Sequence, residues 1–221
     1  LFSLTYFIAR AVSVGEMGIY SWAITAFGVL SIIIIFGQDF FLLKRIPEYA
    51  NNKRKLKQVL GFSLKIIFFL SLISILIIFA SSLFFQKYSE IAYIEGLIIL
   101  SFALPMASLN LINCIVLRTN DRPLLSQVCE SLIQPAILIF LIIISYYLLE
   151  IQLNSFDLFY FNLIGWVVCI TFSLYFLKGF YKTTFPLFLH NNDSHAWKKD
   201  SSNIFSGVLA WSFLGRSDVL I

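Results

Sequence analysis

Apolar residues in this chain come in long runs separated by short polar breaks. The runs cover residues 1–9, 17–40, 60–85, 94–117, 124–149 and 157–177, and a further run begins near residue 203. A stretch of about 18 or more apolar residues predicts a transmembrane helix, because about 20 helical residues cross the hydrocarbon of a bilayer. Backbone groups in lipid must be satisfied within the segment, so each run is expected to be helical. We therefore expect an all-α, polytopic transmembrane helix bundle with five full spans, preceded by the tail of one span and followed by the start of another.

The composition supports this fold class. Hydrophobic residues make up 59% of the chain and charged residues only 13%, and the mean hydropathy is +0.87. A soluble domain has apolar content nearer half and charged content near a quarter. The chain also lacks an initiator Met and ends inside an apolar run, so we expect it to be a fragment.

Basic residues are concentrated in alternate connecting loops. Twelve of the 16 Lys and Arg residues lie after the second, fourth and sixth runs: Lys44, Arg45, Lys53, Arg54, Lys55, Lys57, Arg118, Arg122, Lys178, Lys182, Lys198 and Lys199. The other loops hold only Arg10 and Lys87. Such asymmetry predicts that the three basic loops face the cytoplasm. The cationic run 51–57 is explained better by this topology than by nucleic-acid binding.

Polar residues inside the runs fall on helix faces. Gln127, Glu130 and Gln134 are spaced to share one face of the helix expected at 124–149, and Asn110 and Asn113 share a face of the run before it. Asn162, Trp166, Cys169 and Ser173 are spaced in the same way along the next run. Such residues act either as hydrogen-bonding contacts between helices or as the wall of a water-filled cavity. For the serines packing is favoured, and for the face with Glu130 both interpretations stay open.

The last run carries Arg216 and Asp218, which point to opposite sides of a helix. If the helix begins near Ile204, Arg216 lies well inside the bilayer, where an arginine is either functional or paired with another helix. Pro105 and Pro135 interrupt two runs and predict kinks there.

No residue pattern in the chain predicts an enzyme. The loops opposite the basic ones are short (10–16, about 86–93 and 150–156), and no nucleophile–base pair or nucleotide motif appears. The three cysteines lack CxxC spacing and are expected to be small buried residues. His190 and His195 around Asp193 are expected to lie in a solvated loop, because no further metal ligand is spaced for them. We therefore expect no catalytic residues, no metal and no cofactor.

Several motifs together resemble a known family. The segment IARAVSVGEMGIY (8–20) has Ala-Arg at the end of a span, a short loop and Gly-x-Tyr opening the next span, and FGQD (36–39) is similar to a Leu-Gly turn. LNLINCIVLRTNDRP (109–123) is an Asn-containing helix that runs into an Arg-rich turn, and GRSDVLI ends the chain. These features resemble Wzx-type flippases of O-antigen and capsule, within the multidrug/oligosaccharidyl-lipid/polysaccharide exporter superfamily.

The resemblance implies a transporter of two six-helix lobes around a central cavity. Residues 1–202 would be the N-terminal lobe, with a truncated first span, and residues 203–221 the start of the second lobe. The implied function is translocation of an undecaprenyl-pyrophosphate-linked oligosaccharide across the bacterial inner membrane. The implied partners are this lipid-linked substrate, membrane lipids, a coupling ion (a proton or sodium) and other polysaccharide-assembly proteins, but no nucleic acid.

The resemblance also suggests roles for individual residues. Arg10 and Arg216 are candidates to hold the pyrophosphate, because the arginine fork matches phosphate oxygens. Glu130 or Asp218 would couple an ion. Sugar hydroxyls would bind along a substrate path with these polar candidates: Asn110, Asn113, Gln127 and Gln134. The alternatives are a drug or metabolite exporter of the same superfamily, a polysaccharide polymerase or acyltransferase, and a membrane scaffold.

Overall fold

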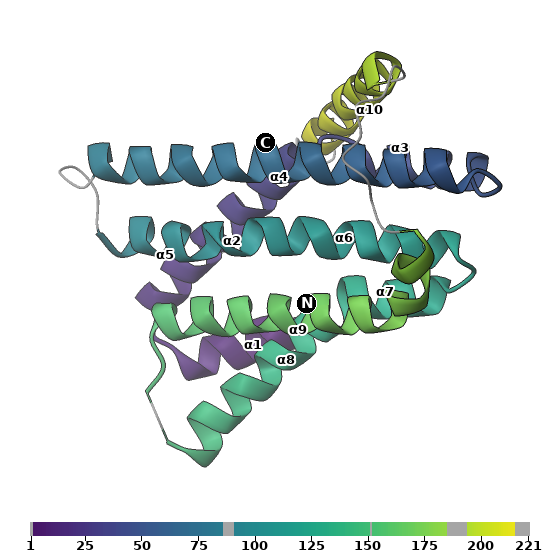
Figure 1. Ribbon diagram of the computed structural model, residues 1–221. Helices are drawn as coiled ribbons and strands as arrows, with labels where there is room; N and C mark the ends of the chain where they lie inside the picture. Colours follow the sequence, from purple (N-terminus) through teal and green to yellow (C-terminus); the bar gives the residue numbers. More distant parts are fainter. Residues whose placement is uncertain (1, 86–90, 151, 185–193, 215–221) are drawn as a thin grey trace.

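The computed structural model describes residues 2–85, 91–150, 152–184 and 194–214 (Figure 1). Within these ranges it contains helices and their connections and no β-strand. In chain order the elements are α1 (Phe2–Ala11), α2 (Val14–Ile35), α3 (Gln38–Glu48), α4 (Lys53–Phe85), α5 (Ile91–Ser101), α6 (Ala103–Thr119), α7 (Pro123–Ser131), α8 (Ile133–Ile142), the π-helix η1 (Ile143–Leu148), α9 (Ser155–Thr183) and α10 (Ser194–Leu214). The prediction of an all-α fold is confirmed for the described residues.

Several helical segments are long and apolar enough to cross a membrane. Four segments meet this condition alone: Val14–Glu48, Lys53–Ser82, Pro123–Tyr146 and Ser155–Lys182. A fifth is the pair Tyr93–Ser101 and Ala103–Thr119, which is bent by 41°. These five correspond in order to the five full runs of the sequence, so their existence was predicted correctly.

The predicted boundaries were wrong at two places. The second run, expected at 17–40, ends in a turn at Phe36 and Gly37, and the chain continues as the separate helix α3. The expected polar loop up to residue 202 contains the first part of α10, which begins at Ser194. Helix α3 is amphipathic and the first residues of α10 are mostly polar, so an apolar run does not reveal them. The proposed division at 202/203 falls inside α10, and the two-lobe arrangement stays a prediction.

Helix α6 lies at the centre of the bundle. It contacts α2, α3, α4, α5, α7 and α9, and every residue from Ile112 to Leu117 is buried. In Figure 1, α4, the α5–α6 pair and α9 run alongside one another, while α2 and α8 cross them obliquely. The side chains from Ile112 to Leu117 are therefore enclosed by protein and do not face lipid.

Two helix breaks follow from proline. Pro105 lies in the first turn of α6, and α5 ends four residues earlier at Ser101. Pro135 lies near the start of α8, and α7 ends four residues earlier at Ser131. A proline removes one backbone hydrogen bond and its ring crowds the carbonyl four residues before it, which explains both positions. The kink predicted at Pro105 is confirmed by the 41° bend between α5 and α6. At Pro135 the structure shows a break between α7 and α8.

The turn after α3 with the basic residues that flank it, the basic turn between α6 and α7 and the basic C-terminal end of α9 all lie at one end of the bundle, on the right in Figure 1. The turn between α6 and α7 is tied to α9 by Arg122, whose Nη1 donates to the carbonyl of Phe176 at 3.5 Å. At the opposite end, a carboxylate oxygen of Glu16 accepts from the backbone N–H of Ser155 at 2.7 Å, which joins the start of α2 to the start of α9. Arg10, at the end of α1, belongs to this second end.

Helix α10 is attached to α3 by a polar and aromatic contact that we call the α3–α10 junction. Gln38 is buried; its Nε2 donates to Ser201 Oγ at 2.6 Å, and its Oε1 accepts from Ser63 Oγ of α4 at 2.7 Å. Arg45 forms an ion pair with Asp200 and another with Glu48 at 2.7 Å. The buried ring of Trp197 packs on three other rings, those of Phe41, Tyr49 and Phe62. Hydrogen bonds, charge and aromatic packing thus fix α10 on α3.

Candidate functional site

Polar side chains line the face of α9 that is turned toward α2 and α6. Together with polar residues of α6 and α7 they form a set that we call the polar seam: Asn110, Asn113, Ser126, Asn162, Trp166, Ser173 and Tyr181. On α9 they recur about every turn, which is the spacing of one helix face. The spaced row of Asn162, Trp166 and Ser173 in the sequence therefore does face the protein interior.

The α6 part of the seam contains the two predicted asparagines. Both polar atoms of the Asn113 side chain have a hydrogen-bond partner. Its Nδ2 donates to Ser173 Oγ at 2.9 Å, and its Oδ1 accepts from the Tyr181 hydroxyl at 2.7 Å. Asn110 is 2% exposed and its Nδ2 donates to the carbonyl of Cys129 at 3.2 Å. Asn113 thus connects α6 to α9, and Asn110 connects α6 to α7.

Four buried polar atoms of the seam have no hydrogen-bond partner within the protein: Asn110 Oδ1, Ser126 Oγ, Asn162 Oδ1 and Trp166 Nε1. An unsatisfied buried polar atom costs about 1–3 kcal/mol, so native proteins rarely keep one without a use. Around Asn162 the Tyr20 hydroxyl of α2 lies within hydrogen-bonding reach. The seam therefore holds neutral donors and acceptors that remain available in the interior of the bundle.

The predicted face of Gln127, Glu130 and Gln134 is not one face in the structure. The helix breaks at Leu132, between α7 and α8, so Gln134 belongs to another helix. Gln127 and Glu130 are exposed, whereas Gln134 is half-buried and packs its Cγ over Gly165 of α9. The expectation of a single shared face was wrong, because Pro135 interrupts the helix four residues after Ser131.

The carboxylate of Glu130 has a partner that was not predicted. Its Oε2 lies 2.6 Å from Arg118 Nη2 at the end of α6, and both side chains are 38% exposed. The tight turn between α6 and α7 folds the two helices back on each other and brings these charges together. An acid and a base on either side of a predicted turn are the signal in the sequence that could have revealed this pair.

The remaining candidates lie apart from the seam. Arg10 is exposed on α1, with its guanidinium 5.0 Å from the centre of the Tyr6 ring. Arg216 and Asp218 lie outside the described residues. Tyr181, Gln38 and Ser63 were not among the candidates, because they stand beyond or at the edges of the apolar runs. A polar residue one helical turn past a recognised row, such as Tyr181 after Ser173 and Leu177, is the available clue.

The three cysteines meet although they are far apart in the sequence. The Cys169 Sγ donates to the Cys129 carbonyl at 3.8 Å, and the thiols of Cys114 and Cys129 are in contact. All three are free and buried. Within the described ranges, no group of three or more His, Cys, Asp or Glu residues is arranged to hold a metal ion. The cysteines contribute to the packing of α6, α7 and α9.

Replacing Asn113 with Leu is expected to weaken the contact between α6 and α9. The hydroxyl of Tyr181 loses its acceptor and Ser173 loses a donor, and such interhelical bonds in membranes are worth about 0.6–2 kcal/mol. Thermal unfolding of the purified protein in detergent should show the loss. Leu109→Asn, on the exposed side of the same helix, is the control, and a melting temperature equal to that of the wild type for Asn113→Leu would contradict the seam's structural role.

The seam can bind polar, uncharged groups. Amide and hydroxyl groups both donate and accept hydrogen bonds, and the indole N–H of Trp166 donates. None of the seam residues carries a charge. Among the described arginines outside the seam, Arg118 and Arg122 lie at one end of the bundle and Arg10 at the other. The chain matches no family model, no curated protein and no solved structure.

Proposed function

We propose that this chain is the first lobe of a membrane carrier that moves a lipid-linked oligosaccharide between leaflets of the bacterial inner membrane. In this proposal the basic end faces the cytoplasm, as the positive-inside rule predicts, and residues 203–221 begin a second lobe. The carrier is a flippase of the Wzx type, and the cargo is an oligosaccharide joined to undecaprenyl pyrophosphate.

The observation that carries the proposal is the set of unpartnered polar atoms beside two proline breaks. Asn110 stands on α6, seven residues after Ala103, and Ser126 stands on α7, which ends at Ser131. Carriers commonly bind their cargo where membrane helices are interrupted, because interrupted helices can move in segments. Sugar hydroxyls match the neutral donors and acceptors that the seam offers.

The anionic part of the cargo requires cations at the ends of the path. Arg118 and Arg122 lie exposed at the basic end, although Arg118 is shared with Glu130. Arg10 presents its guanidinium at the other end. We propose that the pyrophosphate is received at the basic end and reaches Arg10 after translocation, since charge-assisted bonds to Arg hold phosphate oxygens strongly. Glu130, held by Arg118, remains the described candidate for ion coupling.

Replacing Asn110 with Leu is expected to reduce the rate of oligosaccharide translocation at least several-fold, because the variant removes an interior acceptor of the seam. The measurement uses the full-length protein in cells that depend on it for export, and follows the arrival of the lipid-linked oligosaccharide at the outer leaflet. Membrane levels of each variant are compared by immunoblot. Arg10→Ala should show a similar loss if the pyrophosphate reaches Arg10.

Gln127→Leu is the matched control, because Gln127 is also an amide on a membrane helix but is exposed and outside the seam. It should leave the translocation rate unchanged. A full rate for Asn110→Leu, inserted at the wild-type level, would refute the seam as the cargo path. Efflux of cationic dyes that depends on Glu130, with no oligosaccharide transport, would instead favour a drug exporter.

A further inference from the structure

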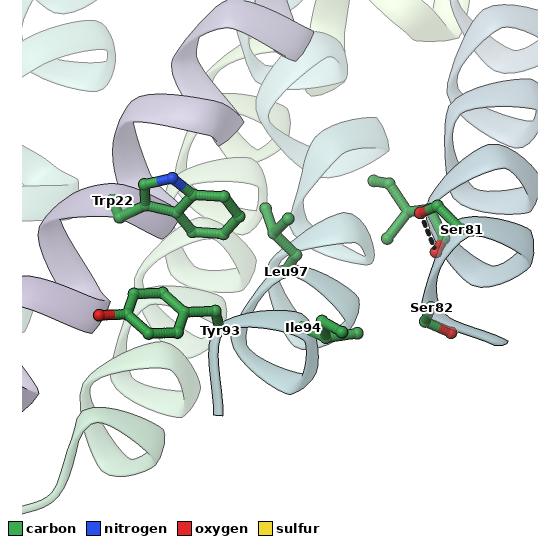
Figure 2. A pocket seen from close by; sticks show the side chains of 7 residues that line it. Trp22, Ser81, Ser82, Tyr93, Ile94 and Leu97 are labelled. Carbon is green, nitrogen blue, oxygen red and sulfur yellow. Dashed lines mark hydrogen bonds between the residues drawn. The ribbon is translucent and has the colours of Figure 1, made fainter. Parts of the chain in front are cut away.

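A cavity of about 440 Å³ lies between α2, α4 and α5, away from the polar seam. Its lining residues are Trp22, Ile78, Ser81, Ser82, Tyr93, Ile94 and Leu97. In Figure 2, Trp22 and Tyr93 stand on one side and the two serines of α4 on the other, with Ile94 and Leu97 between them. Its volume falls in the range of ligand sites, about 300–1,000 Å³.

The cavity is unsuited to water or to a polar ligand. The hydroxyl of Ser81 donates to the carbonyl of Ile78 at 2.8 Å, and that of Ser82 donates to Phe79 at 2.7 Å. Both serine hydroxyls therefore donate their hydrogen bonds within α4. The other walls of the cavity are aliphatic or aromatic side chains. Apolar cavities of this kind stay dry, because a water molecule needs two to four polar partners.

The mouth of this cavity is surrounded by lipid hydrocarbon when the helices lie in a bilayer. Next to the lining serines, α4 turns Leu76, Ile77 and Phe79 outward, each more than half exposed. These side chains belong to a segment that is long and apolar enough to cross a membrane. An empty space of this size would forfeit dispersion contacts on all its walls, whereas an inserted lipid chain restores them.

The position of the cavity along the helices suits a chain that enters from a headgroup. Ser82 stands three residues before the end of α4 and Tyr93 is the third residue of α5, so the cavity begins about 5 Å from the helix ends. This is the end opposite the basic loops. Trp22 and Tyr93 form an edge-to-face pair with ring centres 5.5 Å apart, and Trp and Tyr are typical of the boundary between headgroups and hydrocarbon.

We infer that this cavity is a binding site for one acyl chain of a bilayer phospholipid from the leaflet opposite the basic end. The headgroup stays at the surface while the chain fills the space beside Leu97. Because lipid tails are as apolar as the protein side chains, the binding depends on shape and on filling the cavity. The site depends on the bilayer position of α2, α4 and α5, but not on the cargo of the proposed carrier.

The test uses the purified full chain in nanodiscs of phosphatidylethanolamine and phosphatidylglycerol with a trace of phosphatidylethanolamine that carries a diazirine in one acyl chain. After illumination, mass spectrometry maps the lipid adducts. We expect adducts on Tyr93 and Leu97 to be several-fold more frequent than on Leu76 and Phe79, which lie at similar depth on the outer face of α4. Equal frequencies would overturn the site, since ordinary surrounding lipid gives that pattern.

A filling variant makes the test specific. Leu97→Trp occupies the cavity and should reduce adducts on Tyr93 several-fold while leaving those on Phe79 unchanged, and Ile77→Trp adds the same bulk on the outer face and should change neither. If Leu97→Trp elutes as aggregate in size exclusion, Ile94→Phe replaces it. Undiminished adducts on Tyr93 in a folded filling variant would overturn the proposal.

A second arm identifies other occupants. A benzophenone amino acid at Ile94 should cross-link to lipid, and a cross-link to a peptide of this chain, within one molecule or between two copies, would contradict the inference. These cross-linking experiments measure lipid binding and do not measure translocation of oligosaccharide. A loss of lipid adducts can therefore be distinguished from a failure of the proposed function.

Discussion

Gly37→Ala is expected to detach α10 from α3 and to lower the free energy of unfolding by about 2–4 kcal/mol. Gly37 has φ +70°, a conformation that side chains other than glycine rarely adopt. An added Cβ would lie 2.9 Å from the backbone N of Phe205 and 3.0 Å from the carbonyl oxygen of Ser201. Both contacts are to backbone atoms of α10, which cannot turn away as a flexible side chain would.

The result is measured by thermal unfolding in detergent and by hydrogen–deuterium exchange of the peptides from α10. Exchange in residues 196–208 should rise in the variant, because the bond from Gln38 to Ser201 can no longer form. Gly28→Ala is the control, since a Cβ there meets nothing within 4 Å and Ala is the better helix former by about 1 kcal/mol. Unchanged exchange in α10 for Gly37→Ala would show that the close contact is not required.

Gly96→Ala is expected to separate α5 from α9, at a cost of about 1–3 kcal/mol. A Cβ on Gly96 would lie 2.5 Å from Cε2 and 2.6 Å from Cζ of Phe159. The Phe159 ring is fully buried and packs on Tyr20 and Phe156, so it has little freedom to move. Small residues at such crossings allow membrane helices to approach closely.

A second substitution tests this explanation for Gly96. The double variant Gly96→Ala/Phe159→Leu should recover part of the lost stability, since the shorter side chain leaves space for the methyl group. A coupling energy of about 0.5–3 kcal/mol in the double-mutant cycle is expected for residues in contact. Gly18→Ala, where the Cβ meets nothing within 4 Å, should be neutral. Strict additivity of the two changes would refute the steric explanation.

The spans could be predicted from the sequence because their cause is local. A run such as 60–85 is mostly apolar and holds one charged residue, Lys65, and a helix satisfies its backbone within the segment in lipid. The kinks at Pro105 and Pro135 are local in the same sense, since each proline acts on a carbonyl four residues away. The turn after α3 with its flanking basic residues, the basic turn after α6 and the basic end of α9 likewise lie at one end of the bundle, as a chain that crosses back and forth requires.

The contacts between helices could not be predicted in the same way. The partner of Gln38 is Ser201, 163 residues away, and neither residue stands in a recognisable motif. The resemblance indicates a turn at FGQD (36–39), but it does not indicate that Phe36, a residue other than glycine, has φ 47°. The separate helix α3 after this turn was not predicted. The faces of Asn162 and Ser173 were predictable from spacing alone, but the free oxygen of Asn110 depends on the side chains around it.

The enclosed position of α6 has a consequence for how the chain enters the membrane during synthesis. Asn113 finds its partner Ser173 only 60 residues later, which at about 5–20 residues per second is a delay of roughly 3–12 s on the ribosome. Throughout that interval the amide of Asn113 lies in the translocon or in lipid without the hydroxyl groups of Ser173 and Tyr181 to which it later bonds. Insertion of the middle of this chain therefore takes several seconds, during which α6 has to be kept out of contact with lipid. A nascent chain that is halted before α9 is the species most exposed to quality-control proteases.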